Sequence, residues 1–271
     1  LKIFEQAKVS CVYLGTSELD RVLEAAKASS EVITFGLDQA ADVYAYDFRT
    51  EANGSHFKVH FPTGRPGYPD ADFKLSLLGS FNIINALAAL SAAWSLAVPL
   101  AAMQAGLAEA TVPGRMECFS SADGKLIIVD YAHNLMSFEA LFAAFKNEYP
   151  AHHYSIVFGC PGYKAYDRRR DLGLIAGREA DDIILTEEDP GAEPLEQICA
   201  EIAEYVREAG KAPRIILERE EAICAAIDSA PVDSIILITG KGRETRQKRG
   251  SEYIEVRSDV QIVEGHLQKT Q

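Results

Sequence analysis

The sequence predicts an α/β protein made of an incomplete first domain and a complete, doubly wound second domain. Three observations lead to this fold class. In the second half, short apolar runs alternate regularly with amphipathic segments, which is typical of a parallel sheet covered by helices on both faces. The first half has only two such apolar runs. A Pro-Gly pair at 113–114 separates the two patterns, so we predict domains at 1–112 and 113–271.

In the first half, Val9–Leu14 and Glu31–Gly36 are predicted to be buried strands that flank a helix at Glu18–Ala28. Short strands of a small antiparallel patch should follow, and then two helices. We expect the strands at Val43–Arg49, His56–Pro62 and Phe73–Leu77, and the helices at Asn82–Leu96 and Leu100–Glu109.

In the second half, five apolar strands and four helices are expected. The strands are Leu126–Val129, Ser155–Phe158, Asp182–Leu185, Arg214–Leu217 and Ser234–Ile238, and the helices are Ser137–Lys146, Arg168–Ala180, Leu195–Ala209 and Arg219–Ser229. Open sheets of this class bind ligands beyond the carboxyl ends of their strands. The polar motifs of this sequence follow such ends.

Composition excludes several classes of protein. A net charge of −13 argues against nucleic acid as a partner, because binding to phosphate backbones needs basic surface. No stretch reaches the roughly 18 apolar residues of a membrane span. The five cysteines are scattered and form no C-x-x-C pair, so we expect reduced, mostly buried thiols, no metal site and a cytoplasmic location.

Two motifs lie near the predicted domain boundary. Asn82 and Asn85 are three residues apart and share one face of a first helical turn. Capping of the helix would explain Asn82 but not Asn85, so a capping role and a ligand-binding role are equally well supported by this motif. Arg115 follows Pro113-Gly114 and can be a solvated hinge residue, or it can bind phosphate with its permanent, bidentate charge.

Two further motifs follow strand ends. Asp130-Tyr131-Ala132-His133-Asn134 offers a carboxylate suited to ribose hydroxyls, although His133 could equally bind backbone groups. Gly159-Cys160-Pro161-Gly162 leads to a helix start with three arginines, Arg168 to Arg170. Cations oppose the helix dipole there, so this position favours an anionic ligand over simple solvation.

The last two motifs are an acidic turn and a glycine-rich turn. Glu187-Glu188-Asp189-Pro190-Gly191 could be an ordinary polar turn. Gly240-Lys241-Gly242-Arg243-Glu244 could be a plain strand-to-helix turn, and it does not match the phosphate-binding loop of P-loop proteins.

Together, the order and spacing of these motifs resemble the Mur ligase family. Val157-Phe158-Gly159-Cys160, Thr186–Pro190 and Gly240–Glu244 look most like its branch that adds a diamino acid to UDP-N-acetylmuramoyl-L-alanyl-D-glutamate during peptidoglycan synthesis. The resemblance implies that residues 1–112 are half of a central ATPase-type domain without its phosphate loop. It implies that 113–271 are the Rossmann-like domain that binds the incoming amino acid.

The resemblance also implies roles for individual residues. Asn82 and Asn85 would contact adenine and Asp130 the ribose, with His133 nearby. Arg115 would bind the ATP phosphates and is the predicted catalytic residue. Arg169 would meet the carboxylate of the incoming amino acid. Its amino groups would be surrounded by Glu188, Asp189, Gly240 and Glu244.

The implied reaction is ATP-dependent. ATP and Mg²⁺ would activate the carboxylate of the UDP-N-acetylmuramoyl dipeptide as an acyl phosphate, which the amine of the incoming residue attacks. Since the sequence has no phosphate loop, we expect the chain alone to be inactive. The alternatives are a ligase similar to folylpolyglutamate synthases and a non-catalytic amino-acid-binding fragment.

The acidic turn bears on which amino acid is added. Relatives that add meso-diaminopimelate resemble one another in carrying D-N-P-R, whereas this chain has Glu188-Asp189-Pro190-Gly191. An acid replaces the asparagine and glycine replaces the arginine. We therefore expect a negative pocket that selects the lone ammonium of L-lysine, or of another diamino acid such as ornithine, and repels a second carboxylate.

Overall fold

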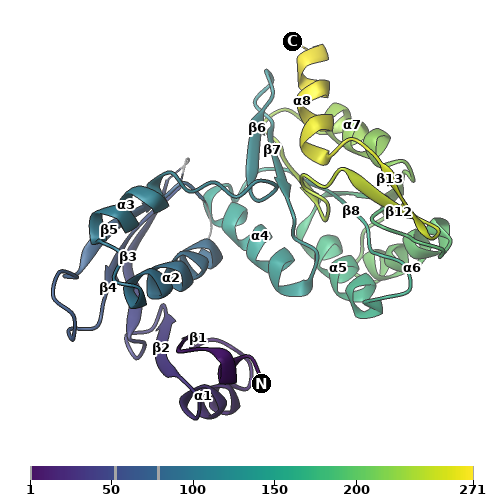
Figure 1. Ribbon diagram of the computed structural model, residues 1–271. Coiled ribbons are helices and arrows are strands. Elements are labelled where there is room, and N and C mark those ends of the chain that lie inside the picture. Colours follow the sequence, from purple (N-terminus) through teal and green to yellow (C-terminus); the bar gives the residue numbers. More distant parts are fainter. Residues whose placement is uncertain (1, 52–53, 78–79, 271) are drawn as a thin grey trace. The chain divides into compact units, whose positions relative to one another are not determined.

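The structure is a computed structural model that describes residues 2–51, 54–77 and 80–270. It divides into two compact units, Leu1–Thr111 and Val112–Gln271. The division falls one residue before the predicted boundary at 112/113. Each unit has its own sheet, and they are described in turn (Figure 1).

The first unit contains one five-stranded sheet in the order β1-β2-β3-β4-β5. Its strands are β1 (Val9–Tyr13), β2 (Glu31–Gly36), β3 (Val43–Glu51), β4 (Gly54–His60) and β5 (Ala71–Leu75). The first three strands are parallel and the last three are antiparallel. The predicted antiparallel patch is confirmed as β3-β4-β5, and it continues the parallel part of the sheet because β3 also pairs with β2.

Helices pack against this sheet through an apolar core. They are α1 (Leu19–Lys27), α2 (Ser80–Ser95) and α3 (Leu100–Ala108), after a short 3-10 turn at Phe4–Gln6. Leu87 and Leu90 of α2 join Phe57 and Phe73 of the sheet in one buried cluster. Burial of these side chains contributes on the order of 2 kcal/mol each.

The second unit is built on a six-stranded sheet in the order β10-β9-β8-β11-β7-β6. Its strands are β6 (Glu117–Ser120), β7 (Leu126–Asp130), β8 (Tyr154–Phe158), β9 (Asp182–Leu185), β10 (Arg214–Ile215) and β11 (Ile235–Thr239). The five predicted strands are present and parallel, which confirms the doubly wound class. The edge strand β6 is antiparallel and was not predicted.

Helices cover both faces of this sheet (Figure 1). They are α4 (Leu135–Glu148), α5 (Tyr166–Glu179), α6 (Leu195–Glu208), α7 (Arg219–Ser229) and α8 (Asp259–Thr270). Side chains of α7 and α8 form a buried cluster with Ile127, Val129 and Ile236 of the sheet. A polar hairpin, β12 (Arg246–Arg249) and β13 (Glu252–Glu255), precedes α8. The hairpin and α8 were not predicted.

Two composition-based expectations can be compared with the structure. All five cysteines are free thiols, but only Cys160 and Cys199 are buried, and Cys118 is exposed. The expectation of mostly buried thiols was therefore only partly right. Among the described residues, no helix is long and apolar enough to cross a membrane.

Candidate active site

The carboxyl ends of the parallel strands bring four motifs to one edge of the second sheet. β7 ends at Asp130, β8 at Phe158, β9 at Leu185 and β11 at Thr239. The loops that follow contact one another through the backbone. Gly240 N donates to Asp130 O at 3.2 Å, and Gly162 N donates to Asp189 O at 3.1 Å. This edge is where a sheet of this topology binds ligands.

Asn82 and Asn85, the predicted adenine contacts, lie in the first turns of α2 in the first unit. Asn82 is buried and Asn85 is exposed. Asn85 Nδ2 donates to Asn82 Oδ1 at 3.3 Å, as expected for residues three apart in a helix. Gly79, which begins this motif, lies outside the described residues. The helical placement leaves the adenine contact a prediction.

Asp130 holds the first residues of the second unit in place. Its two carboxylate oxygens accept the backbone amides of Met116 at 2.8 Å and Ala132 at 2.7 Å. Burial raises the pKa of Asp130, while these two amides and the nearby Arg115 oppose that rise. Each oxygen keeps a second lone pair, so the arrangement is compatible with a ribose contact.

His133 is oriented by its own loop. Its Nδ1 lies 2.7 Å from Tyr131 O. A carbonyl oxygen can only accept, so Nδ1 carries the proton and Nε2 of the neutral ring can accept a hydrogen bond from a ligand. Asn134 then caps α4 through a capping box with Ser137.

Arg115 is exposed and its guanidinium lies 4.7 Å from the ring centre of Tyr131. Among the described residues it has no carboxylate partner. A cation stacked on an aromatic ring gains on the order of 1 kcal/mol and keeps its donors available to an anion. The geometry therefore fits a phosphate ligand.

Glu188 is a buried carboxylate at the centre of the acidic turn. No described residue donates a hydrogen bond to it. Burial raises the pKa of Glu188 to about 7, although Arg219, Arg168 and Lys241 favour its charged form. Among the described residues, the Glu188 oxygens are not fully enclosed, so a ligand can reach them, and this side chain is suited to an ammonium group from a ligand.

Gly240 makes room for Glu188. A Cβ atom built at Gly240 would lie 2.8 Å from Glu188 Oε2, and the backbone φ of 105° also disfavours any side chain there. Glycine is therefore required beside the carboxylate.

Asp189 and Glu244 are already neutralised by one lysine. Lys241 Nζ lies 2.9 Å from Asp189 Oδ1 and 2.9 Å from Glu244 Oε2, and it also donates to Arg246 O. The Lys241 side chain is buried, and sequence reasoning gave it no role. The expected cluster of three acids thus reduces to Glu188 as the one without a partner among the described residues.

Arg169 is buried and its guanidinium is shared by two acids. It donates to both oxygens of Glu193 at 2.8 Å and also to Glu201. Its terminal nitrogens are therefore occupied, and its Nε is buried without a hydrogen-bond partner among the described residues. We expected Arg169 to meet the carboxylate of the incoming amino acid directly. The neighbouring Arg168 has no ion-pair partner among the described residues and lies near enough to Glu188 to affect its pKa.

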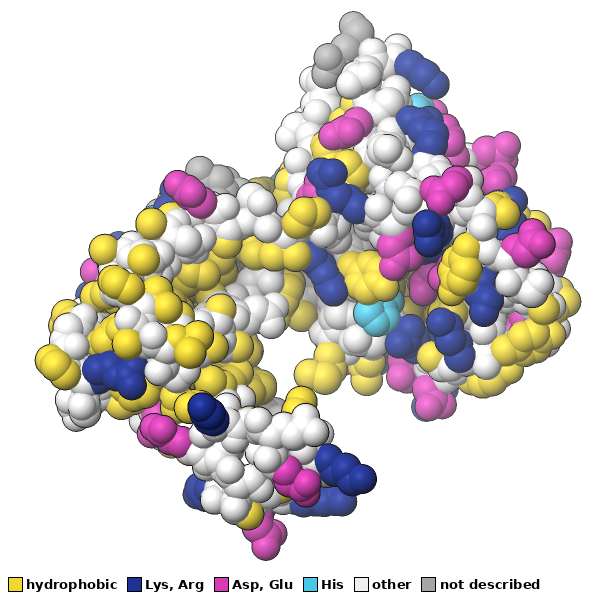
Figure 2. All heavy atoms as spheres, in the orientation of Figure 1, with side chains coloured by type: hydrophobic (Ala, Val, Ile, Leu, Met, Phe, Trp, Pro, Cys, Tyr) yellow, Lys and Arg dark blue, Asp and Glu magenta, His cyan; other side chains and the backbone are white. Residues whose placement is uncertain are grey.

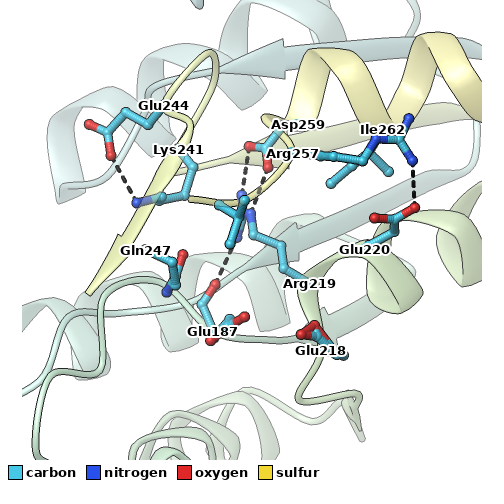
Figure 3. A pocket seen from close by; sticks show the side chains of 11 residues that line it. Glu187, Glu218, Arg219, Glu220, Lys241, Glu244, Gln247, Arg257, Asp259 and Ile262 are labelled. Carbon is cyan, nitrogen blue, oxygen red and sulfur yellow. Dashed lines mark hydrogen bonds and ion pairs between the residues drawn. The ribbon is translucent and has the colours of Figure 1, made fainter. Parts of the chain in front are cut away.

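Two other arginines near the acidic turn are paired as well. Arg219 binds both oxygens of Asp259 at 2.6 and 2.7 Å, and Arg249 binds Glu187 and Glu218. These pairs surround a pocket of about 160 Å³ next to the Gly240–Glu244 loop (Figure 3). In the view of Figure 2, acidic and basic side chains are interspersed on the second unit and form no single basic patch.

The described residues do not form a magnesium site. Among them, no group of three or more His, Cys, Asp or Glu side chains is placed to hold a metal ion. The carboxylates of the pocket are paired with arginine or lysine instead. No step of the reaction is therefore assigned to Mg²⁺ on these residues.

The motifs resemble known proteins along almost the whole chain. A family model described as "Mur ligase middle domain" matches residues 1–93, and one described as "Mur ligase, glutamate ligase domain" matches residues 114–242.

Two curated relatives cover most of the chain. One is the UDP-N-acetylmuramoyl-L-alanyl-D-glutamate–2,6-diaminopimelate ligase of Caldanaerobacter subterraneus, with 32% identity over 93% of this chain and 51% of the relative. The other is the corresponding L-lysine ligase of Enterococcus faecalis, with 33% identity over 88% of this chain and 46% of the relative. The chain thus spans about half the length of these relatives.

The fold is also that of a solved ligase. A structure of a UDP-N-acetylmuramoyl-L-alanyl-D-glutamate–2,6-diaminopimelate ligase covers 99% of this chain with a TM-score of 0.59 and 26% identity, and the match covers 55% of the solved chain. The lysine and diaminopimelate enzymes are equally similar to this sequence, so overall identity does not separate the two substrates.

Proposed function

Because this chain belongs to the Mur ligase family, we propose that it forms part of an ATP-dependent ligase of peptidoglycan synthesis. The ligase would add a diamino acid, preferably L-lysine, to UDP-N-acetylmuramoyl-L-alanyl-D-glutamate. ATP supplies the phosphoryl group that activates the dipeptide carboxylate. The five free thiols favour a reducing compartment, and we place the reaction in the cytoplasm.

Glu188 carries the proposal. Its side chain is buried, its carboxylate accepts no hydrogen bond from the described residues, and Gly240 leaves space beside it. An ammonium ion would supply the missing donor and the missing charge. A hydrogen bond between charged groups contributes roughly 1.5–3 kcal/mol, which corresponds to at least tenfold in affinity.

The pairing of the surrounding cations favours lysine over diaminopimelate. Both amino acids carry one α-carboxylate, for which Arg168 is available. Diaminopimelate brings a second carboxylate that needs a second cation. Lys241, Arg169, Arg219 and Arg249 are already bound by acids, and the acidic turn holds glycine at position 191. A second carboxylate would therefore be buried without a partner.

Two roles follow for the nucleotide motif. Arg115 would bind the ATP phosphates, since its guanidinium is exposed and stacked on Tyr131. Nε2 of His133 would accept a hydrogen bond from the nucleotide or the dipeptide, because the Tyr131 carbonyl holds the proton on Nδ1. Asp130 would keep Arg115 close through its bond to the neighbouring Met116 amide.

Steady-state kinetics of the purified full-length protein would test the proposal. We expect a higher kcat/KM for L-lysine, or for ornithine, than for meso-diaminopimelate, measured as ADP release that depends on the UDP-linked dipeptide. A higher kcat/KM for meso-diaminopimelate would refute the lysine assignment. Absence of dipeptide-dependent ADP release with all three amino acids would refute the ligase itself.

Gly191→Arg is a second test of the charge argument. It restores a cation in the acidic turn and leaves the Lys241–Asp189 pair in place. Gly191 has a φ of 59°, so arginine there costs about 1 kcal/mol of backbone strain. We expect the preference to move toward meso-diaminopimelate, further still when Asp189→Asn is added. Gly191→Ala carries the same strain without the charge and should leave the preference unchanged.

A further inference from the structure

Glu117 connects the first residues of the second unit to the Gly240–Glu244 loop. We call residues 112–117 the entry segment. The Glu117 carboxylate accepts hydrogen bonds from Nε and from one terminal nitrogen of Arg243, the latter at 2.7 Å. It also accepts a hydrogen bond from the backbone amide of Gly114. Arg243 holds the pKa of Glu117 below its usual range, which is the sign of a favourable pair.

The two segments also touch through their backbones. A Cβ atom at Gly242 would lie 2.8 Å from Gly114 O, and one at Gly114 would lie 3.1 Å from Arg243 N. Both glycines have positive φ, 58° and 78°. Contact this close leaves no room for a side chain at Gly242. Glycine at this position therefore allows the loop and the entry segment to pack directly against each other.

Tyr131 lies close to both segments. Its ring supports the guanidinium of Arg115, and the nearby Glu244 carboxylate raises the pKa of the Tyr131 hydroxyl. Arg115 belongs to the entry segment and Glu244 to the loop. The entry segment and the loop are therefore joined at two places, by the Glu117–Arg243 ion pair and by the close backbone contact of Gly114 with Gly242.

The same loop lies beside Glu188, which is the proposed amino-acid site. Gly240 faces Glu188, and Lys241 binds Asp189 and Glu244. One side of a five-residue loop thus contacts the proposed amino-acid site, and the other side contacts the segment that carries the proposed phosphate-binding arginine.

We propose that Glu117 and Arg243 are positioning residues that hold Arg115 and the amino-acid pocket in one fixed arrangement. The identity of the two ligands rests on the proposed function. An amino acid in the pocket then orders the entry segment, and an anion at Arg115 orders the pocket, because binding coupling is reciprocal. Correct placement matters for the reaction, since an error of about 1 Å can cost on the order of a hundredfold in rate.

Hydrogen exchange of the chain tests the connection without any ligand. We compare Arg243→Gln, Arg243→Lys and the control Lys211→Gln, which breaks an exposed ion pair with Asp181 away from both segments. Arg243→Gln should speed exchange at least tenfold at Gly114, Arg115 and Met116 as well as within the loop. Arg243→Lys should restore part of the protection, and Lys211→Gln should change neither segment. Faster exchange in the loop alone would overturn the proposal.

A second arm of the experiment uses L-lysine as the probe. In the unmodified chain, tens of millimolar L-lysine should slow exchange in both the loop and the entry segment. In Arg243→Gln it should protect the loop only. Protection confined to the loop in the unmodified chain would overturn the coupling. If the two segments respond together to Arg243→Gln but L-lysine protects neither, the positioning role stands and the proposed amino-acid site fails.

Discussion

The fold places the Glu188 carboxylate where its charged form is unfavourable. A carboxylate buried without a hydrogen-bond donor favours its neutral form, and its pKa is about 7. Such an arrangement lowers the stability of the ligand-free protein and is common where a side chain serves a ligand.

The first prediction concerns Glu188→Gln. Because the pKa is raised in the folded state, folding keeps a proton that the unfolded chain releases, so stability falls as pH rises from about 4.5 to 7. Glutamine does not ionise and avoids this loss. We expect Glu188→Gln to stabilise the second unit at pH 8 by up to about 3 kcal/mol and to have little effect at pH 4. Urea unfolding followed through the NMR signals of β11 amides would measure this.

Glu193→Gln is the matched comparison. Arg169 holds the pKa of Glu193 below its usual range, so its charge stabilises the fold above the unfolded pKa, and that stability is lost as pH falls. Glu193→Gln should therefore destabilise the second unit at pH 8. If both variants destabilise it there, Glu188 has a donor in solution and the argument for an empty ammonium site fails.

Arg169 gives the second prediction. Arg169, on α5, forms a buried ion pair with Glu193, in the segment before α6. The side-chain exposures are 2% for Arg169 and 4% for Glu193. Arg169→Met should cost about 3–5 kcal/mol, because Glu193 is left buried without its partner. The double change Arg169→Met with Glu193→Gln should recover much of that loss. Normal stability of Arg169→Met, with a large rise in KM for the amino acid, would instead support direct ligand binding.

At the level of secondary-structure elements, the third prediction concerns the turn after β11. Gly240→Ala adds a methyl group 2.8 Å from Glu188 Oε2 at a φ of 105°. Gly210→Ala, at a φ of 90° with nothing within 4 Å, carries the strain without the contact. We expect Gly240→Ala to weaken L-lysine binding at least tenfold and Gly210→Ala to leave it unchanged. Titration of the chain followed by NMR would show the difference, and equal effects would separate Gly240 from the pocket.

The sequence predicted those elements that have a strong hydrophobic period. Four of the five parallel strands of the second unit are buried apolar runs such as Ile235–Thr239, whereas β10 is a short, exposed strand. The missed strands lack that signal. The missed helix α8 has it, since Val260 and Val263 lie three residues apart on its buried face. Arg246–Arg249 and Glu252–Glu255 form a polar hairpin, and β6 is a short edge strand of alternating burial. Their pairing depends on tertiary contacts that no local pattern contains.

The location of the candidate site was also predictable, but its pairings were not. Motifs that follow parallel strands must lie at one edge of the sheet, so Asp130 and Gly240 could be expected to be neighbours. Which cation binds which acid depends on distances of a few ångströms. Lys241 takes Asp189 and Glu244, and Glu193, which belonged to no motif, takes Arg169. An acid three residues after Lys241 was the one available signal for the first of these pairs.

At the level of the whole molecule, the predicted nucleotide contacts are divided between two compact units. Asn82 and Asn85 belong to the first, and Arg115, Asp130 and His133 to the second. Each of the two units has its own apolar core.

The fourth prediction follows from this division. Arg115→Ala should lower kcat of the full-length protein by at least a hundredfold and leave its melting temperature within about 1 °C, because an exposed side chain contributes little to stability. Arg21→Ala, which removes another exposed arginine, should affect neither quantity. Near-normal turnover of Arg115→Ala would make Arg115 a surface residue.

Lys241 has a consequence for the whole ligase. Its Nζ is the same chemical group as the side-chain amine of free lysine, and it is tethered beside the pocket. A tethered group acts at an effective concentration in the millimolar range or above, so Lys241 is a built-in competitor for Glu188. Asp189 and Glu244 keep it elsewhere. By holding Lys241 away from Glu188, these two acids would leave Glu188 free to bind the substrate ammonium without contacting the substrate themselves.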